Sequence, residues 1–133
     1  MHVPDSYDYA VIRVVPRVER EEFINAGVIV WCSTQDFLGA RLDLDESRAR
    51  ALDPSIDMEA VRKHLASIIV VCEGGDAAGS LGKLTKRARF DWLVAPRSTM
   101  IQTSAVHTGR CTDLSGTLEH LLNVMVRAPR TAP

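Results

Sequence analysis

Residues 7–16 read Tyr7-Asp8-Tyr9-Ala10-Val11-Ile12-Arg13-Val14-Val15-Pro16, a run of aromatic and β-branched side chains that favours a β-strand. The proline ends the strand because it has no amide hydrogen to donate to a neighbour. Residues 26–33 and 37–43 have a similar composition, and the polar residues 33–36 between them suit a hairpin turn. These three strands predict an antiparallel meander.

The spacing of apolar residues then changes from that of a strand to that of a helix. Residues 46–52 predict a short helix that ends before Pro54. Asp57 is a candidate N-cap for a longer helix, and Gly74-Gly75 ends it. Its apolar positions recur every three or four residues, at Met58, Val61, Leu65, Ile68 and Cys72.

The rest of the chain is less regular. Residues 74–82 are rich in glycine and alanine and predict a loop, whereas residues 89–94 predict a fourth strand before Pro96. Residues 95–112 have no clear period. Asp113 is a candidate cap for a last helix, in which Leu114, Leu118, Leu121 and Met125 share one face.

These elements predict one α+β domain, in which an antiparallel sheet of three to four strands packs against two main helices. We place the domain at residues 7–127, between tails at 1–6 and 128–133. The length of 133 residues leaves room for one domain and for a core that needs neither disulfide nor metal. The 46% apolar content and the net charge of −1 exclude an intrinsically disordered chain.

The compartment follows from three features. The N-terminus resembles no signal peptide, and the longest apolar run, residues 68–72, is too short to cross a bilayer. Three cysteines with no C-x-x-C pair fit a reducing cytoplasm, and no membrane contact is expected. Cys32 and Cys72 lie in apolar runs and are expected to be buried, whereas Cys111 lies in a polar stretch and is the thiol to test for reactivity.

Charge is unevenly distributed along the chain. Residues 36–59 hold seven acidic and three basic side chains, a local charge of −4. Residues 81–111 hold six basic side chains and one acidic, a local charge of +5. This pattern predicts either two solvated faces of opposite sign or an anion-binding surface beside residues 96–110.

The most unusual stretch is residues 96–112, which gathers two guanidiniums, an imidazole, an amide and six hydroxyls. Arginine matches phosphate or carboxylate geometry, and hydroxyls donate to anion oxygens. The alternative is a long connection whose hydroxyls bond back to its own backbone. The candidate ligand-binding residues are Arg97, Ser98, Thr99, Gln102, Ser104, His107, Thr108 and Arg110.

A catalytic role would rest on His107 as the acid or base. No H-x-H, H-E-x-x-H or Walker motif is present, so we predict no metal and no cofactor. No nucleophile or second acid is evident from the spacing, and this disfavours an enzyme.

Several segments together resemble the bacterial DUF3037 family, a domain of unknown function. They are residues 7–16, residues 22–28 (Glu-Phe-Ile-Asn-Ala-Gly-Val), and residues 89–99 continuing to His107-Thr108-Gly109. The most specific part is Pro96-Arg97-Ser98-Thr99 with Gln102 and the His-Thr-Gly sequence. The resemblance implies a short cytosolic protein with no assigned activity and a partner role, a HipA-like kinase being one partner.

Three functions remain open. The first is a non-catalytic binding module whose 96–112 segment holds a nucleotide, a nucleic acid phosphate or an acidic protein surface. The second is a small enzyme that acts on a phosphorylated substrate with His107 as acid or base. The third is a structural role or a homodimer.

Overall fold

The centre of the fold is strand β1, Asp5–Val14, which has neighbours on both sides. The computed structural model describes residues 3–129. Alternate residues of a strand face opposite sides of the sheet. In β1, Ile12 and Val14 pack on one side of the sheet and Tyr7 and Val11 on the other. Both faces are therefore buried, which is why residues 9–15 of the sequence are apolar except for Arg13.

The predicted meander is confirmed. Strand β1 pairs antiparallel with β2, Ile24–Cys32, and β2 pairs antiparallel with β3, Phe37–Leu42. The β2–β3 turn has Asp36 in a left-handed conformation with φ of 48°, which aspartate tolerates better than most residues. A register shift between Ile12 and Arg13 brings Arg13 opposite Asn25.

Two short strands on the other side of β1 complete a sheet of five, one more than the upper prediction. Strand β4, Ile101–Thr103, pairs with the end of β1, and β5, His107–Cys111, pairs with its beginning. The stretch expected to lack regular structure therefore contains both strands. They were missed because strands of three and five residues are too short to show a period.

Each of the four α-helices begins at a capping side chain. Asp45, Asp57, Thr85 and Asp113 accept hydrogen bonds from backbone amides of the first turn, which leaves fewer amides unpaired. The α-helices are α1 (Glu46–Leu52), α2 (Met58–Glu73), α3 (Lys86–Leu93) and α4 (Leu114–Leu121); η1 (Val18–Arg20) and η2 (Asp76–Lys83) are 3-10 helical, and η3 (Leu122–Val126) is a π-helical continuation of α4.

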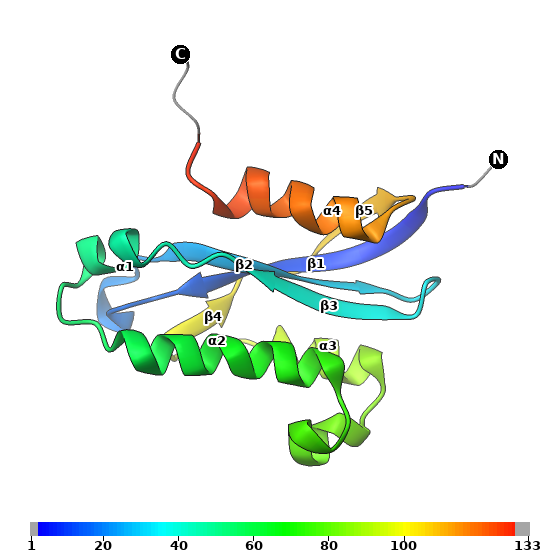
Figure 1. Cartoon of the computed structure of the whole chain (residues 1–133), viewed down its shortest axis with the longest axis horizontal. Coiled ribbons are helices and arrows are strands. Elements are labelled where there is room, and N and C mark those ends of the chain that lie inside the picture. Colours follow the sequence, from blue (N-terminus) through cyan, green and yellow to red (C-terminus); the bar gives the residue numbers. More distant parts are fainter. Residues whose placement is uncertain (1–2, 130–133) are drawn as a thin grey trace.

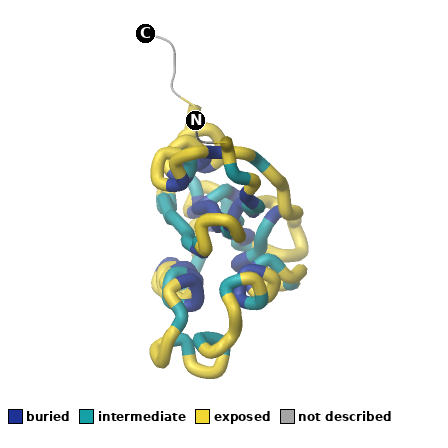
Figure 2. The backbone as a smooth tube through the Cα atoms, turned by 90° about the vertical axis from the view of Figure 1, so that its right-hand side faces the viewer, coloured by how far each residue is buried: buried dark blue, intermediate teal, exposed yellow. Residues whose placement is uncertain are grey.

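The layers of the molecule are visible in Figure 1, where α2 and α3 lie on one side of the sheet and α4 lies on the other. Each side has its own apolar core. One joins β1 and β2 to α2 and α3, and the other joins the opposite faces of the same strands to α4 and η3. The tube in Figure 2 shows buried positions concentrated between these layers, and the turns of η2 at the exposed lower end.

Residues 89–94 correct one prediction, because they form most of helix α3 and not a strand. Phe90 and Leu93 are three residues apart and both face the core, which is helical spacing. The missed signal was Thr85, whose hydroxyl oxygen accepts a hydrogen bond from the Ala88 amide at 3.1 Å. Aromatic and β-branched composition favours strands only where packing agrees, and here the cap and core contacts select a helix.

The predicted boundaries need a smaller adjustment. Strand β1 already begins at Asp5, inside the expected tail, and the loop expected at 74–82 is mostly the turns of η2. Of the expected C-terminal tail, residues 130–133 lie outside the described residues. No single helix within residues 3–129 is long and apolar enough to span a membrane; only α2 with η2, a pair bent by 60°, passes by length and composition.

Candidate binding surface around Arg97

The sequence-predicted site residues are divided between β4 and β5. Gln102 in β4 lies opposite Arg13, whereas Arg110 in β5 lies opposite Ser6. Seven residues of β1 separate these positions, which corresponds to about 23 Å along the strand. The structure does not bring the Arg97–Gln102 region and Arg110 together.

Most of the hydroxyl and amide groups in this stretch bond to the protein itself. Ser104 is buried, and its Oγ accepts from the Val11 amide at 2.9 Å. Thr99 Oγ1 donates to the Ile101 carbonyl at 2.8 Å, and Gln102 Nε2 donates to the Thr99 carbonyl at 2.9 Å. Thr108 Oγ1 donates to Asp8 at 2.9 Å. Thr99 and Gln102 thus follow the alternative in which side chains bond back to the segment's own backbone, whereas the bonds of Ser104 to Val11 and of Thr108 to Asp8 tie the segment to β1.

Arg97 serves as a cap for helix α3. Its guanidinium donates to the carbonyls of Trp92, Leu93 and Ala95, which are exposed acceptors at the negative end of the helix. The same guanidinium lies over the Trp92 ring, 4.4 Å from its centroid. Arg97 is therefore held rigidly, with much of its hydrogen-bonding capacity already used.

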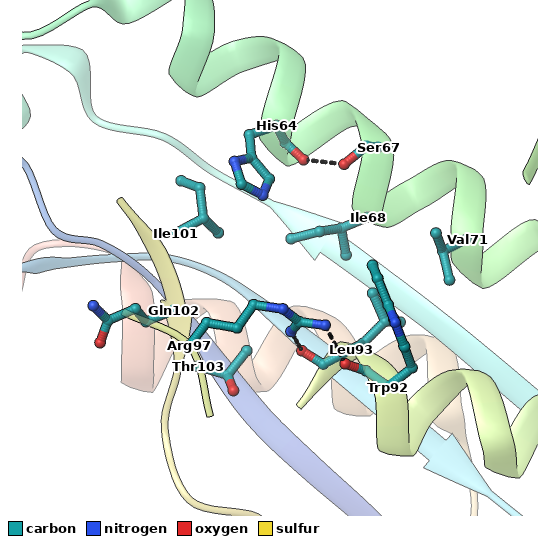
Figure 3. A pocket seen from close by; sticks show the side chains of 10 residues that line it. All are labelled: His64, Ser67, Ile68, Val71, Trp92, Leu93, Arg97, Ile101, Gln102 and Thr103. Carbon is teal, nitrogen blue, oxygen red and sulfur yellow. Dashed lines mark hydrogen bonds between the residues drawn. The ribbon is translucent and has the colours of Figure 1, made fainter. Parts of the chain in front are cut away.

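A cavity lies beside Arg97, between α2, α3 and β4 (Figure 3). Its volume is about 50 Å³, and the figure shows His64 and Ile68 projecting from α2 toward Ile101 and Arg97. The interior is apolar and the rim is polar, but the volume is far below the roughly 300–1,000 Å³ of pockets that enclose a whole small molecule, so this cavity has room only for a small group. The lining residues are Ile68, Val71, Leu93, Ile101 and Trp92, with His64, Ser67, Arg97, Gln102 and Thr103.

Two shallower hollows adjoin this cavity, and all three are lined by Arg97 and Gln102. One, of about 300 Å³, is lined by Arg13, Phe23 and Ser98 as well. The other runs past Pro96 to Val106. We call the three together the Arg97 surface. His107 and Arg110 line none of them.

Arg13 is the residue of this surface that the sequence analysis missed. Its guanidinium lies over the Phe23 ring at 4.2 Å, and no carboxylate within residues 3–129 forms an ion pair with it. Its Nε is buried without a hydrogen-bond partner, as is Oδ1 of Asn25, the residue opposite it in β2. The available signal was a single charged residue inside the apolar run of β1.

The +5 stretch does not form a free basic patch. Lys86 pairs with Asp36 at 2.9 Å and Arg87 pairs with Asp91 at 3.2 Å. Arg89 is buried and donates to the carbonyls of Val71 and Cys72. With Arg97 also bonded to carbonyls, four of the six basic side chains in this stretch are engaged within the protein.

Side chains of the acidic segment, residues 36–59, also have partners within the protein. Arg62 hydrogen-bonds Glu46 and lowers the pKa of that carboxyl. The hydroxyl and amide of Ser55 lower the pKa of Asp53, with a smaller contribution from Arg17. Ion pairs between arginines and this segment leave fewer charges available to a partner than the sequence implied.

His107, the candidate acid or base, lies exposed on β5, and its ring is 5.4 Å from that of Tyr9. Cys111, the thiol singled out for a reactivity test, is buried, as are Cys32 and Cys72. Burial raises the pKa of Cys72 to about 12. In the part of the chain that the structure describes, no group of three or more His, Cys, Asp or Glu side chains could hold a metal ion.

The fold and this surface define a small α+β domain with a polar-rimmed apolar cavity at one edge of its sheet. The chain belongs to the DUF3037 family, described as a protein of unknown function, whose family model matches residues 9–126. Comparison with the curated proteins and with the solved structures finds no match.

Proposed function

We propose that this domain is a non-catalytic binding module, and that the Arg97 surface holds an anionic group of its ligand or partner. The observation that carries the proposal is Arg13. Its guanidinium lines the larger hollow beside Ser98 and Gln102, and no carboxylate of residues 3–129 pairs with it.

The physical argument concerns a half-buried charge. Removing part of a guanidinium from water is costly unless an acceptor replaces the lost water. A carboxylate or phosphate in the hollow supplies that acceptor, and charge-assisted hydrogen bonds are about twice as strong as neutral ones. The exposed Ser98 hydroxyl lies in the same hollow and adds a second donor.

The proposal keeps Arg97, Ser98 and Gln102 from the predicted site and adds Arg13. Arg97 acts mainly by position, because its bonds to three carbonyls hold the wall shared by all three hollows. Rigid walls lower the entropy that binding must overcome.

The test is a thermal-shift panel on the wild type, Arg13→Gln and the matched control Arg110→Gln. The probes are sodium sulfate, sodium acetate, ATP and a short single-stranded oligonucleotide. An anion at a hundred times its Kd stabilises the fold by about 2.7 kcal/mol, which raises Tm by roughly 5–15 °C for a domain of this size.

We expect an anion to raise the Tm of the wild type and of Arg110→Gln, but not the Tm of Arg13→Gln. A shift that survives Arg13→Gln contradicts the proposal. Loss of the shift in Arg110→Gln alone moves the anion site to β5.

A further inference from the structure

Building on the proposed function, we propose that the partner is an extended segment of another protein that carries a carboxylate beside an apolar side chain. The apolar side chain inserts its tip into the cavity lined by Ile68, Leu93 and Ile101, and the carboxylate binds Arg13.

The first support is that the two recognition features adjoin. The apolar cavity and the Arg13 hollow share Arg97 and Gln102 as a common wall. In β4, Ile101 packs into the core on the α2 side of the sheet, whereas Gln102 lies opposite Arg13. Adjacent residues of a strand face opposite sides of the sheet, so the cavity and the Arg13 hollow open on either side of β4. A ligand that occupies both therefore passes over β4 and presents an apolar group to the cavity and an anionic group to the hollow.

The second support is the apolar character of the surroundings. Phe23, Trp92 and Val106 are 43%, 44% and 43% exposed, and each belongs to or borders a hollow of the Arg97 surface. Large apolar side chains beside a pocket are typical of protein contact surfaces, where an aromatic anchor supplies much of the affinity. A free inorganic anion would leave these three side chains in water.

The third support is the small number of free charges. Arg97 is occupied by carbonyls, so Arg13 is the guanidinium of the hollow that has no polar partner within residues 3–129. Glu21 lines the same hollow, so the hollow disfavours a run of several anionic groups and suits a single carboxylate at Arg13. A nucleic acid backbone needs several cations in a row, whereas one carboxylate needs one.

The aromatic rings of the Arg97 surface also disfavour the stacking of nucleic-acid bases. One face of Phe23 is covered by Arg13 at 4.2 Å, and one face of Trp92 is covered by Arg97 at 4.4 Å. Platforms for single strands stack successive bases on open aromatic faces. An aliphatic side chain needs only the edges of these rings and the cavity beside them.

The experiment begins with a selection of random nine-residue peptides displayed on phage, using the wild-type chain as bait and Arg13→Gln as the counter-screen. We expect the enriched peptides to carry Asp or Glu within about three residues of a Leu, Ile, Val or Phe, because adjacent side chains of an extended segment reach neighbouring subsites. Enrichment without this pairing, or no enrichment, overturns the inference.

The strongest enriched peptide is then synthesised with a fluorescent label, and its Kd is measured by anisotropy. Ser67→Phe places a ring at the cavity rim, and Ala66→Phe places the same ring on an exposed position of α2 that lines none of the three hollows. We expect Ser67→Phe to weaken binding about tenfold or more, since burial of one aliphatic side chain is worth at least that factor. Ala66→Phe should leave Kd within about twofold, and melting curves confirm that both variants fold.

The outcomes separate the two proposals. If sulfate or acetate binds through Arg13 but Ser67→Phe leaves the peptide Kd unchanged, the anion site stands and the acidic apolar segment is overturned. If the oligonucleotide displaces the peptide and binds more tightly through Arg13, the partner is a nucleic acid and the inference fails. If no probe depends on Arg13, both proposals fail.

Discussion

Three arginines show how the surroundings of a guanidinium decide its role. Arg89 is buried and donates to carbonyls at the end of α2, and Arg97 does the same at the end of α3. Both complete helix ends that would otherwise lack partners. Arg13 lies over the Phe23 ring and has no hydrogen bond or ion pair within residues 3–129, which leaves its charge available to a ligand.

Arg89→Met should destabilise the fold strongly. The substitution removes donors to the carbonyls of Val71, Cys72 and Leu84. Loss of hydrogen bonds from a buried charged group predicts a decrease of about 2–4 kcal/mol in the free energy of unfolding, measured by urea denaturation. Arg87→Met, at an exposed position, is the control and should cost less than about 1 kcal/mol. Equal losses would show that the Arg89 bonds contribute little.

The cysteines should be unreactive in the native protein. Cys32, Cys72 and Cys111 are buried, which limits access of a reagent to all three. Burial also raises the pKa of Cys72 to about 12, so the reactive thiolate of Cys72 is scarce at neutral pH. An aromatic disulfide reagent at pH 8 should label none of the three rapidly, and all of them after unfolding in guanidinium chloride. Rapid labelling of one native thiol would show that Cys111 is reached from solvent.

At the scale of elements, the connection between α2 and α3 is more structured than its glycine-rich sequence suggests. Gly74 and Gly75 adopt φ values of 74° and 78°, in the region that favours glycine. The Gly75 amide donates to the Gly82 carbonyl at 3.3 Å, which closes the turns of η2 into a loop. The glycines are there to let the backbone approach itself, and not to form a flexible linker.

Gly82→Ala tests this close approach. A Cβ at position 82 would lie 1.9 Å from the Gly75 carbonyl oxygen, so the backbone must move. We expect the free energy of unfolding to fall by about 1–3 kcal/mol. Ser80→Ala, at an exposed position in the same loop, should stay within about 0.5 kcal/mol of the wild type in the same urea titration. If the two variants are equally stable, the loop tolerates the displacement.

At the scale of the whole molecule, ionic bonds fasten the C-terminal helical segment to the sheet. Arg127 pairs with Asp43 at 2.6 Å and also with Glu119, while Asn25 donates to the Met125 carbonyl at 2.8 Å. The Asp43 and Asn25 contacts join the C-terminal helical segment to residues far away in the sequence, whereas the Glu119 pair lies within that segment. The packing of α4 and η3 over their side of the sheet therefore depends on ion pairs as well as on apolar contacts.

Acid should weaken the fold through the ion pairs of Glu119 and Glu46. Hydrogen bonds from Arg127 lower the pKa of Glu119, and those from Arg62 lower that of Glu46. A carboxyl whose pKa is lower in the folded state stabilises the fold above its unfolded pKa, and loses that contribution as pH falls through the folded value. We expect Tm to be level near neutrality and to fall below about pH 4.5.

Glu119→Gln is the control for this pH dependence. Its Tm should lie below that of the wild type at pH 7, and the difference should shrink as the pH falls below 4, because the wild-type carboxyl is then protonated as well. Circular dichroism melts between pH 3 and pH 7 measure both curves. A constant difference at every pH would show that the Glu119 side chain acts through packing and not through its charge.

The predicted site residues lie together only where they are close in sequence. Arg97, Ser98 and Gln102 line the same hollow because they share one short segment. Arg13 is 84 residues before Arg97 along the chain, and only the pairing of β1 with β4 brings the two together. Arg110 belongs to the same segment as Arg97, but β5 carries it to the other end of β1.

Elements with strong local signals could be predicted from the sequence: the β1–β3 meander, the cap and apolar face of α2, and the last helix after Asp113. Their patterns of burial and capping are local and repeat along the chain. Long-range contacts were needed to show that residues 89–93 are helical, that β4 and β5 flank β1, and which charges lack a partner within residues 3–129. Those outcomes depend on contacts between residues far apart in sequence, which periodicity does not encode. The same long-range contacts decide the role of each arginine. An arginine that reaches backbone carbonyls is used by the fold, whereas one without such a partner keeps its charge for a ligand.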